Sequence, residues 1–311
     1  MSLLIATTLD DALSALAAGA RPIAGGSDLV VGARHGKAPL PASLVALDRI
    51  EQLRQVHEVG GASGGLVLGA GVTHHAIETH PVIAARYSSL ADASALVGSP
   101  STRNVGTIGG NVMNGSPAMD TGAPLVVLGA TVELRSTTGT RTVAISELWT
   151  APGRTIARTD ELCTAIHLPA PGPRSGSAYV RLEYRRAMEI AVVGAGASVT
   201  LDVDGNIAAI AVALTAVAPT IISVSGLASL IGSSVADATA AAGALASEQA
   251  RPISDLRASD RYRRHCIGVM ARRAVEAAAR RASGETIGIP VNRTIGIGTA
   301  ATSTAATGAS S

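Results

Sequence analysis

A run of prolines and glycines near the middle of the chain, LPAPGPRSG at residues 168–176, most constrains how this sequence can fold. Proline lacks a backbone donor and glycine has no side chain to pack, so a helix or strand that enters this run ends there. With 311 residues, the chain is long enough for two domains with separate cores. We therefore expect one domain over residues 1–172 and a second over residues 173–284.

The first of these domains mixes short helical patterns with short strand patterns. Residues 9–18 have helical spacing, with Thr8 or Asp10 available as an N-cap, and residues 21–24 form an apolar strand that ends at a double glycine. Further strands are expected at 44–47, 66–68, 132–135 and 141–145, and further helices at 29–33, 73–78 and 84–97. This mixture predicts a domain that contains both helices and strands.

The segment from residue 99 to residue 117 differs from these elements. It is rich in glycine, asparagine and serine and has no amphipathic period, yet ordered elements are expected on both sides of it. Long loops inside a compact domain usually have a function beyond connection. We therefore expect a functional loop here.

The second domain begins with an antiparallel meander. Its strands are expected at residues 177–185, 191–203 and 207–217. Asp204-Gly205 is a hairpin signal between the last two strands, and helices should follow at 237–249 and 260–283. This gives a three-stranded sheet with helices. Periodicity is then lost, so residues 285–311 should form a disordered tail.

Charge and cysteine content exclude several classes of function. The formal net charge is only +2, so no overall field attracts nucleic acid or an anionic membrane surface. Cys163 and Cys266 are far apart and unaccompanied, so they supply neither a disulfide framework nor an iron–sulfur or zinc site. Any metal centre that this protein works with must therefore lie on another chain.

An uncharged stretch between residues 206 and 236 is long enough to cross a bilayer as a helix. Pro219 interrupts it, no Lys or Arg flanks it, and a DVDGN turn comes immediately before it. A buried strand, a proline break and a short helix explain the stretch better. Because the start of the chain also lacks the basic and long apolar regions of a signal peptide, we expect a cytoplasmic protein without a membrane span.

Two glycine pairs carry the chemistry that the residues indicate directly. They lie in Ala24-Gly25-Gly26-Ser27-Asp28, after a strand, and in Thr107-Ile108-Gly109-Gly110-Asn111, within the polar segment. Residues without a Cβ let the backbone approach a bulky anion, and successive N–H groups can then point at one phosphate oxygen. Two such loops favour one pyrophosphate, and hence a dinucleotide, held between them. Two unrelated tight turns remain the alternative.

Three other patterns are weaker evidence of function. The segment VVGAGA at residues 192–197 lacks the third glycine and the following helix of a nicotinamide-binding fingerprint. His74-His75 has no partner ligands at matching spacing, so we expect a solvated or capping role there and no metal site. The arginine-rich region between residues 251 and 281 favours a solvated helix face, with docking to an acidic partner as the alternative.

Five longer segments carry a more specific signal. They are ARPIAGGSDLVVGAR, LGAGVTHHAIE, GSPSTRNVGTIGGNVMNGSPAMDTGAPLVVLGATVEL, YVRLEYRRAMEIAVVGAGASV and SDRYRRHCIGVMARRA. Together they resemble the FAD-binding medium subunit of molybdenum hydroxylases, the family of carbon monoxide dehydrogenase and xanthine dehydrogenase. The resemblance runs in order from about residue 3 to residue 283. It implies an α+β fold: a vanillyl-alcohol-oxidase-type FAD-binding domain of two α+β subdomains, about residues 1–55 and 56–172, followed by a smaller C-terminal α+β domain.

The same resemblance implies which residues hold the cofactor. Both glycine loops would hold the FAD pyrophosphate, Ser116 and Asp120 would lie near the ribityl chain, and Leu162 would lie near the flavin. Arg181 stands where relatives often have Lys, which keeps the charge and changes the donor geometry. Arg181 and Arg185 are the candidates for a cation beside the flavin. Since the chain has no Phe, any aromatic cover must be Tyr or Trp149.

On this resemblance the chain is a medium subunit with no catalytic residue and no metal of its own. Electrons would come from 2Fe–2S clusters on a small subunit, supplied by a molybdopterin cofactor on a large subunit, and would reach non-covalently bound FAD before leaving to a final acceptor. The expected assembly is a dimer of heterotrimers. The alternatives are a stand-alone FAD-dependent oxidase of the same fold and a binding module without redox function.

Overall fold

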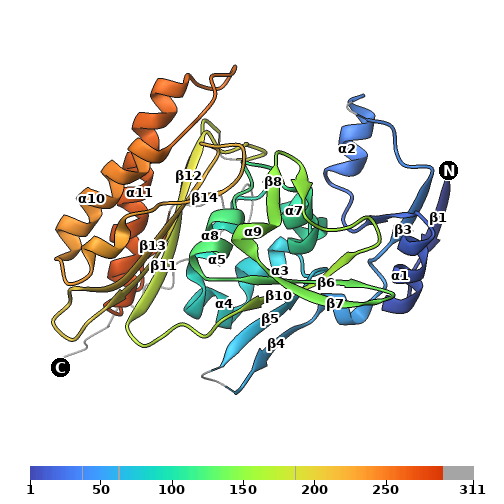
Figure 1. The fold of residues 1–311 in the computed structure, drawn as a ribbon, viewed down its shortest axis with the longest axis horizontal. Coiled ribbons are helices and arrows are strands. Elements are labelled where there is room, and N and C mark those ends of the chain that lie inside the picture. The colour runs from blue at the N-terminus through green and yellow to red at the C-terminus, as the bar shows by residue number, and fades with distance from the viewer. Residues whose placement is uncertain (37, 62–63, 186, 290–311) are drawn as a thin grey trace, which may run out of the picture.

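The computed structural model describes residues 1–36, 38–61, 64–185 and 187–289. The first elements are β1 (Ser2–Ile5), α1 (Leu9–Ala17), β2 (Arg21–Ile23), α2 (Leu29–Arg34), β3 (Ser43–Ala46) and the 3₁₀ helix η1 (Glu51–Arg54). The strands form a parallel sheet in the order β1-β3-β2 at one end of the molecule (Figure 1). A capping box at Thr8 starts α1, which buries Leu13 and Leu16 against Ile50 and Leu53.

Residues 56–168 form an antiparallel sheet with helices on one face. Its strands, in sheet order, are β4 (Val56–Val59), β5 (Gly65–Gly69), β10 (Leu162–Leu168), β6 (Thr131–Ser136) and β7 (Gly139–Ala144). The other elements are α3 (His74–Thr79), α4 (Pro81–Arg86), α5 (Ser88–Ser94), α6 (Pro100–Val105), α7 (Ile108–Asn114), α8 (Gly122–Val127), α9 (Ile145–Leu148), β8 (Trp149–Ala151) and β9 (Arg154–Thr155). Val132 and Leu134 are buried on the helix side, whereas Glu133 between them faces outward.

Two helical segments differ from the expectation. The prediction of a long loop at residues 99–117 was wrong, because α6 and α7 lie there. Ser99 caps α6 immediately before Pro100, and Thr107 caps α7. Helices of six and seven residues bury too few side chains to show an amphipathic period in the sequence. The single helix expected at residues 84–97 is likewise two helices, α4 and α5.

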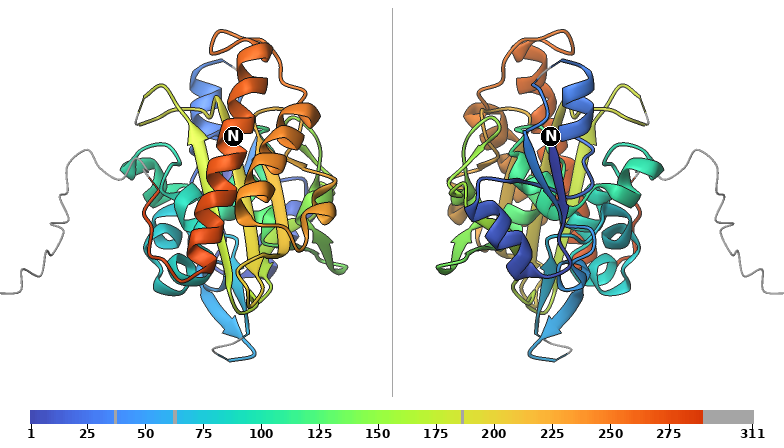
Figure 2. Two further views of the ribbon diagram at one scale, coloured as in Figure 1. Left: turned by 90° about the vertical axis from the view of Figure 1, so that its left-hand side faces the viewer. Right: turned by 90° about the vertical axis from the view of Figure 1, so that its right-hand side faces the viewer.

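The C-terminal part is an antiparallel sheet with two long helices on one face (Figure 2). Its elements are β11 (Ser175–Leu182), β12 (Val193–Leu201), β13 (Ile207–Thr215), β14 (Ile222–Ser223), η2 (Leu227–Leu230), α10 (Val235–Gln249) and α11 (Asp260–Ala282). The three expected strands pair in the order β11-β12-β13, and β14 adds a short fourth strand. Gly205 has φ +84° in the predicted turn between β12 and β13.

The uncharged stretch at residues 206–236 contains β13, β14 and η2, as its proline and turn signals indicated. In the described part of the chain, no helix is long and apolar enough to cross a membrane. Residues 285–289 of the expected tail have no helix or strand, and residues 290–311 lie outside the described residues.

Helices α5 and α8 lie between the two antiparallel sheets and join them (Figure 1). Asp92 on α5 accepts two hydrogen bonds from the Arg281 guanidinium, at 2.6 and 3.0 Å. Asp120, just before α8, pairs with Nη1 of Arg181 on β11 at 2.8 Å. Both ion pairs are largely buried, so the C-terminal part is fixed against the preceding one by charged contacts that cost much to break.

Candidate functional site

The fold brings the two glycine loops together. We call residues 24–28 the first glycine loop and residues 107–111 the second. A Cβ on Gly25 would lie 1.9 Å from the carbonyl oxygen of Val105 and 3.0 Å from the nitrogen of Gly106, directly ahead of the second loop. Only glycine permits so close an approach. Two loops far apart in the sequence therefore share one place in the structure.

The first glycine loop has unused backbone donors. The carbonyl oxygens of Gly26 and Asp28 accept hydrogen bonds from N–H groups of α2, at 2.9 and 2.8 Å. In contrast, no described residue accepts from the N–H groups of residues 25–28. Gly26 has φ +67°, and a left-handed residue in a turn directs neighbouring N–H groups into one concavity. Four consecutive free N–H groups fit an anion such as phosphate.

Over residues 108–111 the second glycine loop has no such spare backbone donors. At 2.9–3.1 Å, Ile108 N–H donates to the Val72 carbonyl, Gly109 N–H to the Ala70 carbonyl, Gly110 N–H to the Thr107 hydroxyl and Asn111 N–H to the Thr107 carbonyl. The loop offers bare surface at Gly110, which is exposed, and the side-chain amide of Asn111. The two loops therefore differ in what they present to a ligand.

The two glycines of the second loop have different roles. A Cβ on Gly109 would lie 2.5 Å from the Ala70 Cβ and 2.7 Å from the Ala70 carbonyl oxygen, so the fold itself requires this glycine. A Cβ on Gly110 would approach only the Thr107 hydroxyl, at 3.0 Å, and would otherwise enter open space. Apart from this one contact the fold makes no demand on Gly110, which fits a surface kept bare for a ligand.

Behind the loops lies a buried polar group that sequence reasoning missed. His74 is 1% exposed, and its backbone N–H donates to the Gly106 carbonyl at 3.0 Å. Burial, with the Arg103 cation nearby, lowers the pKa of His74 to about 4 and keeps its imidazole neutral. The expected solvated role was wrong for His74. It holds for His75, which is exposed and pairs with Glu78 at 2.9 Å.

Asp120 and Arg181 are engaged with each other and with their neighbours. Asp120 accepts from the Tyr179 hydroxyl at 2.9 Å and from Arg181 Nη1 at 2.8 Å. Burial raises the pKa of Asp120, and the Arg181 cation opposes that rise. Arg181 also donates to Glu183 and to the Leu96 carbonyl, and its side chain is 1% exposed. These contacts make the pair a link between the two parts of the chain.

The remaining expected residues lie in different surroundings. Ser116 is half-buried, and its hydroxyl accepts from the Ala118 N–H at 3.3 Å. Leu162 is 4% exposed and fills the core between α1 and β10. Trp149 is buried and donates to the Val112 carbonyl at 2.9 Å.

The four tyrosines fall into a buried pair and an exposed pair. Tyr87 and Tyr179 are buried, whereas Tyr184 and Tyr262 expose their rings. Arg185, the second candidate cation, is exposed and pairs with Glu189 at 3.2 Å.

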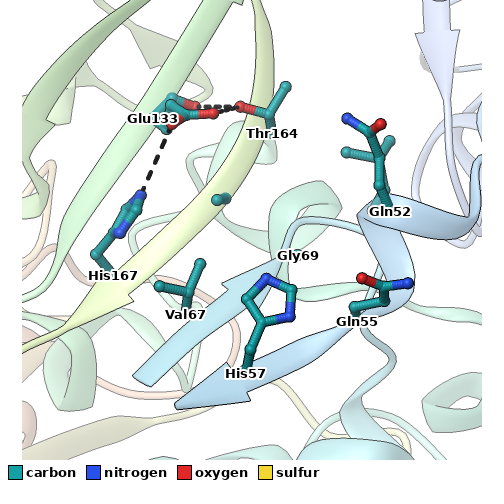
Figure 3. A pocket seen from close by; sticks show the side chains of 10 residues that line it. Gln52, Gln55, His57, Val67, Gly69, Glu133, Thr164 and His167 are labelled. Atoms are coloured by element: carbon teal, nitrogen blue, oxygen red, sulfur yellow. Dashed lines mark hydrogen bonds and ion pairs between the residues drawn. The ribbon is translucent and has the colours of Figure 1, made fainter. Parts of the chain in front are cut away.

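A shallow hollow of about 270 Å³ lies on the outer face of the five-stranded sheet (Figure 3). His167 and Glu133 point toward each other across it, 3.9 Å apart, and Thr164 donates to Glu133. The residues that the structure describes contain no group of three or more His, Cys, Asp or Glu side chains able to hold a metal ion. The hollow is thus a polar sheet surface, and the glycine loops remain the candidate site.

Comparison with known proteins shows the family of this chain. Residues 1–171 match the family model described as the FAD binding domain in molybdopterin dehydrogenase, and residues 178–278 match the CO dehydrogenase flavoprotein C-terminal domain. The carbon monoxide dehydrogenase medium chain of Afipia carboxidovorans is 35% identical over 87% of this chain and 92% of its own. The nicotinate dehydrogenase FAD-subunit of Eubacterium barkeri is 34% identical over 59% of this chain and 62% of its own.

Solved structures extend the comparison to the fold. A chain of the carbon monoxide dehydrogenase from Hydrogenophaga pseudoflava superposes with a TM-score of 0.85 at 29% identity, over 90% of this chain and 98% of that one. A chain of quinoline 2-oxidoreductase from Pseudomonas putida 86 gives 0.83 at 26% identity, over 91% and 98%. This chain belongs to the FAD-binding flavoproteins of the molybdenum hydroxylase family, as a medium subunit of the kind found in carbon monoxide dehydrogenase.

Proposed function

We propose that the pyrophosphate of FAD lies between the two glycine loops. The observation that carries this proposal is the set of four N–H groups at residues 25–28 that have no acceptor among the described residues, in a loop that packs against Val105 and Gly106, directly ahead of the second glycine loop. The N–H groups would stabilise the pyrophosphate charge, and the missing side chain at Gly110 would let the anion approach. Bound FAD supplies the redox chemistry, while the residues of this chain bind and orient it.

The other proposed contacts surround this centre. Ala24 and Ser27 belong to the first loop, and Ser116 follows the second. We propose that Asp120 and Arg181 lie next to the flavin region. Because their charges already neutralise each other, the pair would act there as a fixed structural support. FAD should be bound without a covalent link. Burial raises the pKa of Cys163 to about 12, so its thiol is a poor nucleophile.

The proposed partners follow from what the chain lacks. Cys163 and Cys266 are both buried and unpaired, and a 2Fe–2S cluster needs four ligands. We propose a small 2Fe–2S subunit that delivers electrons and a large molybdopterin subunit that hydroxylates the substrate, assembled as a dimer of heterotrimers in the cytoplasm. Within this chain, residues 1–172 would form the FAD-binding domain and residues 173–284 the C-terminal domain.

The arginine-rich region contributes less free charge to docking than its composition implies. Arg263 is buried and pairs with Asp255 at 2.7 Å, and Arg281 is bound to Asp92. Arg280 pairs with Glu285 at 2.8 Å. Since these cations are already neutralised within the chain, they add little to the attraction of an acidic partner.

Purification of a tagged copy from its native host tests the subunit assignment. The chain should carry FAD and should bring down one partner with iron and one with molybdenum, as metal analysis of the complex would show. Alone, it should bind FAD and oxidise no heterocycle, aldehyde or carbon monoxide. A flavoprotein free of iron and molybdenum, yet fully active on such a substrate, would establish the stand-alone oxidase instead.

A further inference from the structure

A buried hydroxyl holds the side-chain amide of Asn111. Thr121 is 0% exposed, and its Oγ1 donates to Asn111 Oδ1 at 2.6 Å. Because an amide is planar, a fixed oxygen on the buried side leaves Nδ2 on the opposite side. No described residue accepts a hydrogen bond from Nδ2, and Asn111 is half-buried next to exposed Gly110. The Nδ2 group is therefore a free donor beside the bare surface of the second glycine loop.

We propose that Thr121 is a positioning residue for the cofactor: its hydroxyl orients Asn111 so that Nδ2 donates to bound FAD. This inference rests on the FAD site proposed above. The backbone N–H groups of residues 108–111 all have protein acceptors, so at these positions only a side chain can donate to the ligand. Thr121 lies ten residues beyond Asn111 and outside both glycine loops.

The surroundings of Thr121 fix its hydroxyl in place. Thr121 is the residue before α8, and α8 packs against β12 and β13. Its neighbour Asp120 is held by Tyr179 and Arg181 at 2.9 and 2.8 Å. The fold therefore fixes the orientation of the Asn111 Nδ2 donor before any ligand binds. A preorganised donor loses little freedom on binding, so its hydrogen bond contributes more to affinity.

The test compares Thr121→Val with Thr121→Ser in the full chain, with FAD affinity measured by quenching of flavin fluorescence. Valine keeps the volume of threonine and removes the donor, and it should weaken FAD binding about tenfold. Serine keeps the donor and should restore affinity to within about twofold of wild type. The unfolding midpoint of each apo variant shows whether a loss of affinity comes from a loss of fold.

A double-mutant cycle tests whether Thr121 affects FAD binding through Asn111. If Thr121 acts through Asn111, Thr121→Val should cost nothing further in an Asn111→Ala background. Asn111→Asp serves if the valine variant does not fold, because it keeps the acceptor for Thr121 and removes the Nδ2 donor. It should lose FAD at least as severely.

Wild-type affinity in Thr121→Val, equal losses in both backgrounds, or tight binding by Asn111→Asp would each overturn the inference. None of these results would affect the FAD site as long as the wild-type chain binds FAD. Failure of the wild-type chain to bind FAD would instead remove the site itself.

Discussion

A branched side chain at Gly110 should abolish FAD binding and leave the fold intact. A Cβ there meets only the Thr107 hydroxyl, at 3.0 Å, so this N-cap of α7 has to shift by only a few tenths of an ångström. In a helix, valine is slightly more favourable than glycine, by a few tenths of a kcal/mol. The unfolding free energy of the apo chain with Gly110→Val should therefore lie within about 1 kcal/mol of wild type.

The loss of binding should be much larger. The valine methyl groups would occupy the space that the pyrophosphate needs, and the anion would move away from the N–H groups of residues 25–28. Losing two hydrogen bonds to a charged group, at about 1.5–3 kcal/mol each, gives at least about 3 kcal/mol, or more than hundredfold in affinity. Flavin content after purification and titration with FAD measure this directly.

Gly109→Ala is the matched control. Its Cβ would lie 2.7 Å from the Ala70 carbonyl oxygen, so the chain must shift at a cost of about 1–3 kcal/mol in unfolding free energy. The two substitutions should therefore have different effects: Gly110→Val should weaken FAD binding, and Gly109→Ala should destabilise the fold. Wild-type flavin content and affinity in Gly110→Val would refute the assignment of Gly110 as the ligand-facing surface.

Three further outcomes are expected. The pKa of His74 lies near 4 in the native chain and near 6.5 when unfolded, so its stabilisation is complete above pH 6.5 and is lost as the pH falls toward 4, by up to about 3 kcal/mol. Urea titrations of wild type and His74→Gln should show a weaker pH dependence in the variant. Arg181→Met should destabilise the chain by about 3 kcal/mol in urea, and adding Asp120→Asn should restore part of that, because no buried carboxylate then lacks its cation. Acid precipitation should release all flavin into the supernatant, and yellow colour left in the pellet would show a covalent link.

Local patterns predicted many of the regular elements of this chain, but not β1, β4, α8 or β10, the central strand of the five-stranded sheet. Thr8 starts α1, the double glycine ends β2, and Gly205 turns β12 into β13, as caps and turn residues indicated. Each of these features depends on neighbours within a few residues, which is why the sequence is sufficient to find them. Helices α6 and α7 were missed because their side chains are too few to form a period.

The division of labour within the site depends on long-range neighbours. The glycine pairs indicated where a pyrophosphate could lie, but the pattern is the same for Gly109 and Gly110. Ala70, 39 residues before Gly109, distinguishes them by contacting only one. Asp120 and Arg181 are 61 residues apart and form an ion pair, although each looks like an unpaired charge in the sequence. Such roles come from tertiary contacts, which no local spacing encodes.

The contrast between the loops predicts how hydrogen exchange should respond to FAD. The N–H groups of residues 108–111 donate to protein oxygens whether or not a ligand is present, so they should be protected in the apo chain and change little on binding. Those of residues 25–28 have no acceptor in the described structure and precede α2, which buries none of its residues. They should exchange rapidly in the apo chain and slow markedly with FAD.

The exchange pattern also shows which loop adapts on binding. The N–H groups of residues 108–111 in the second loop are already bonded to protein oxygens. Those of the first loop bind water until an anion replaces it, so the ordering that accompanies binding should be concentrated in the first loop. Exchange measured by mass spectrometry on peptides covering the two loops separates these cases. Protection of residues 108–111 alone would mean that the N–H groups of the first loop do not hold the pyrophosphate, and equal new protection in both loops would mean that the second loop also becomes ordered on binding.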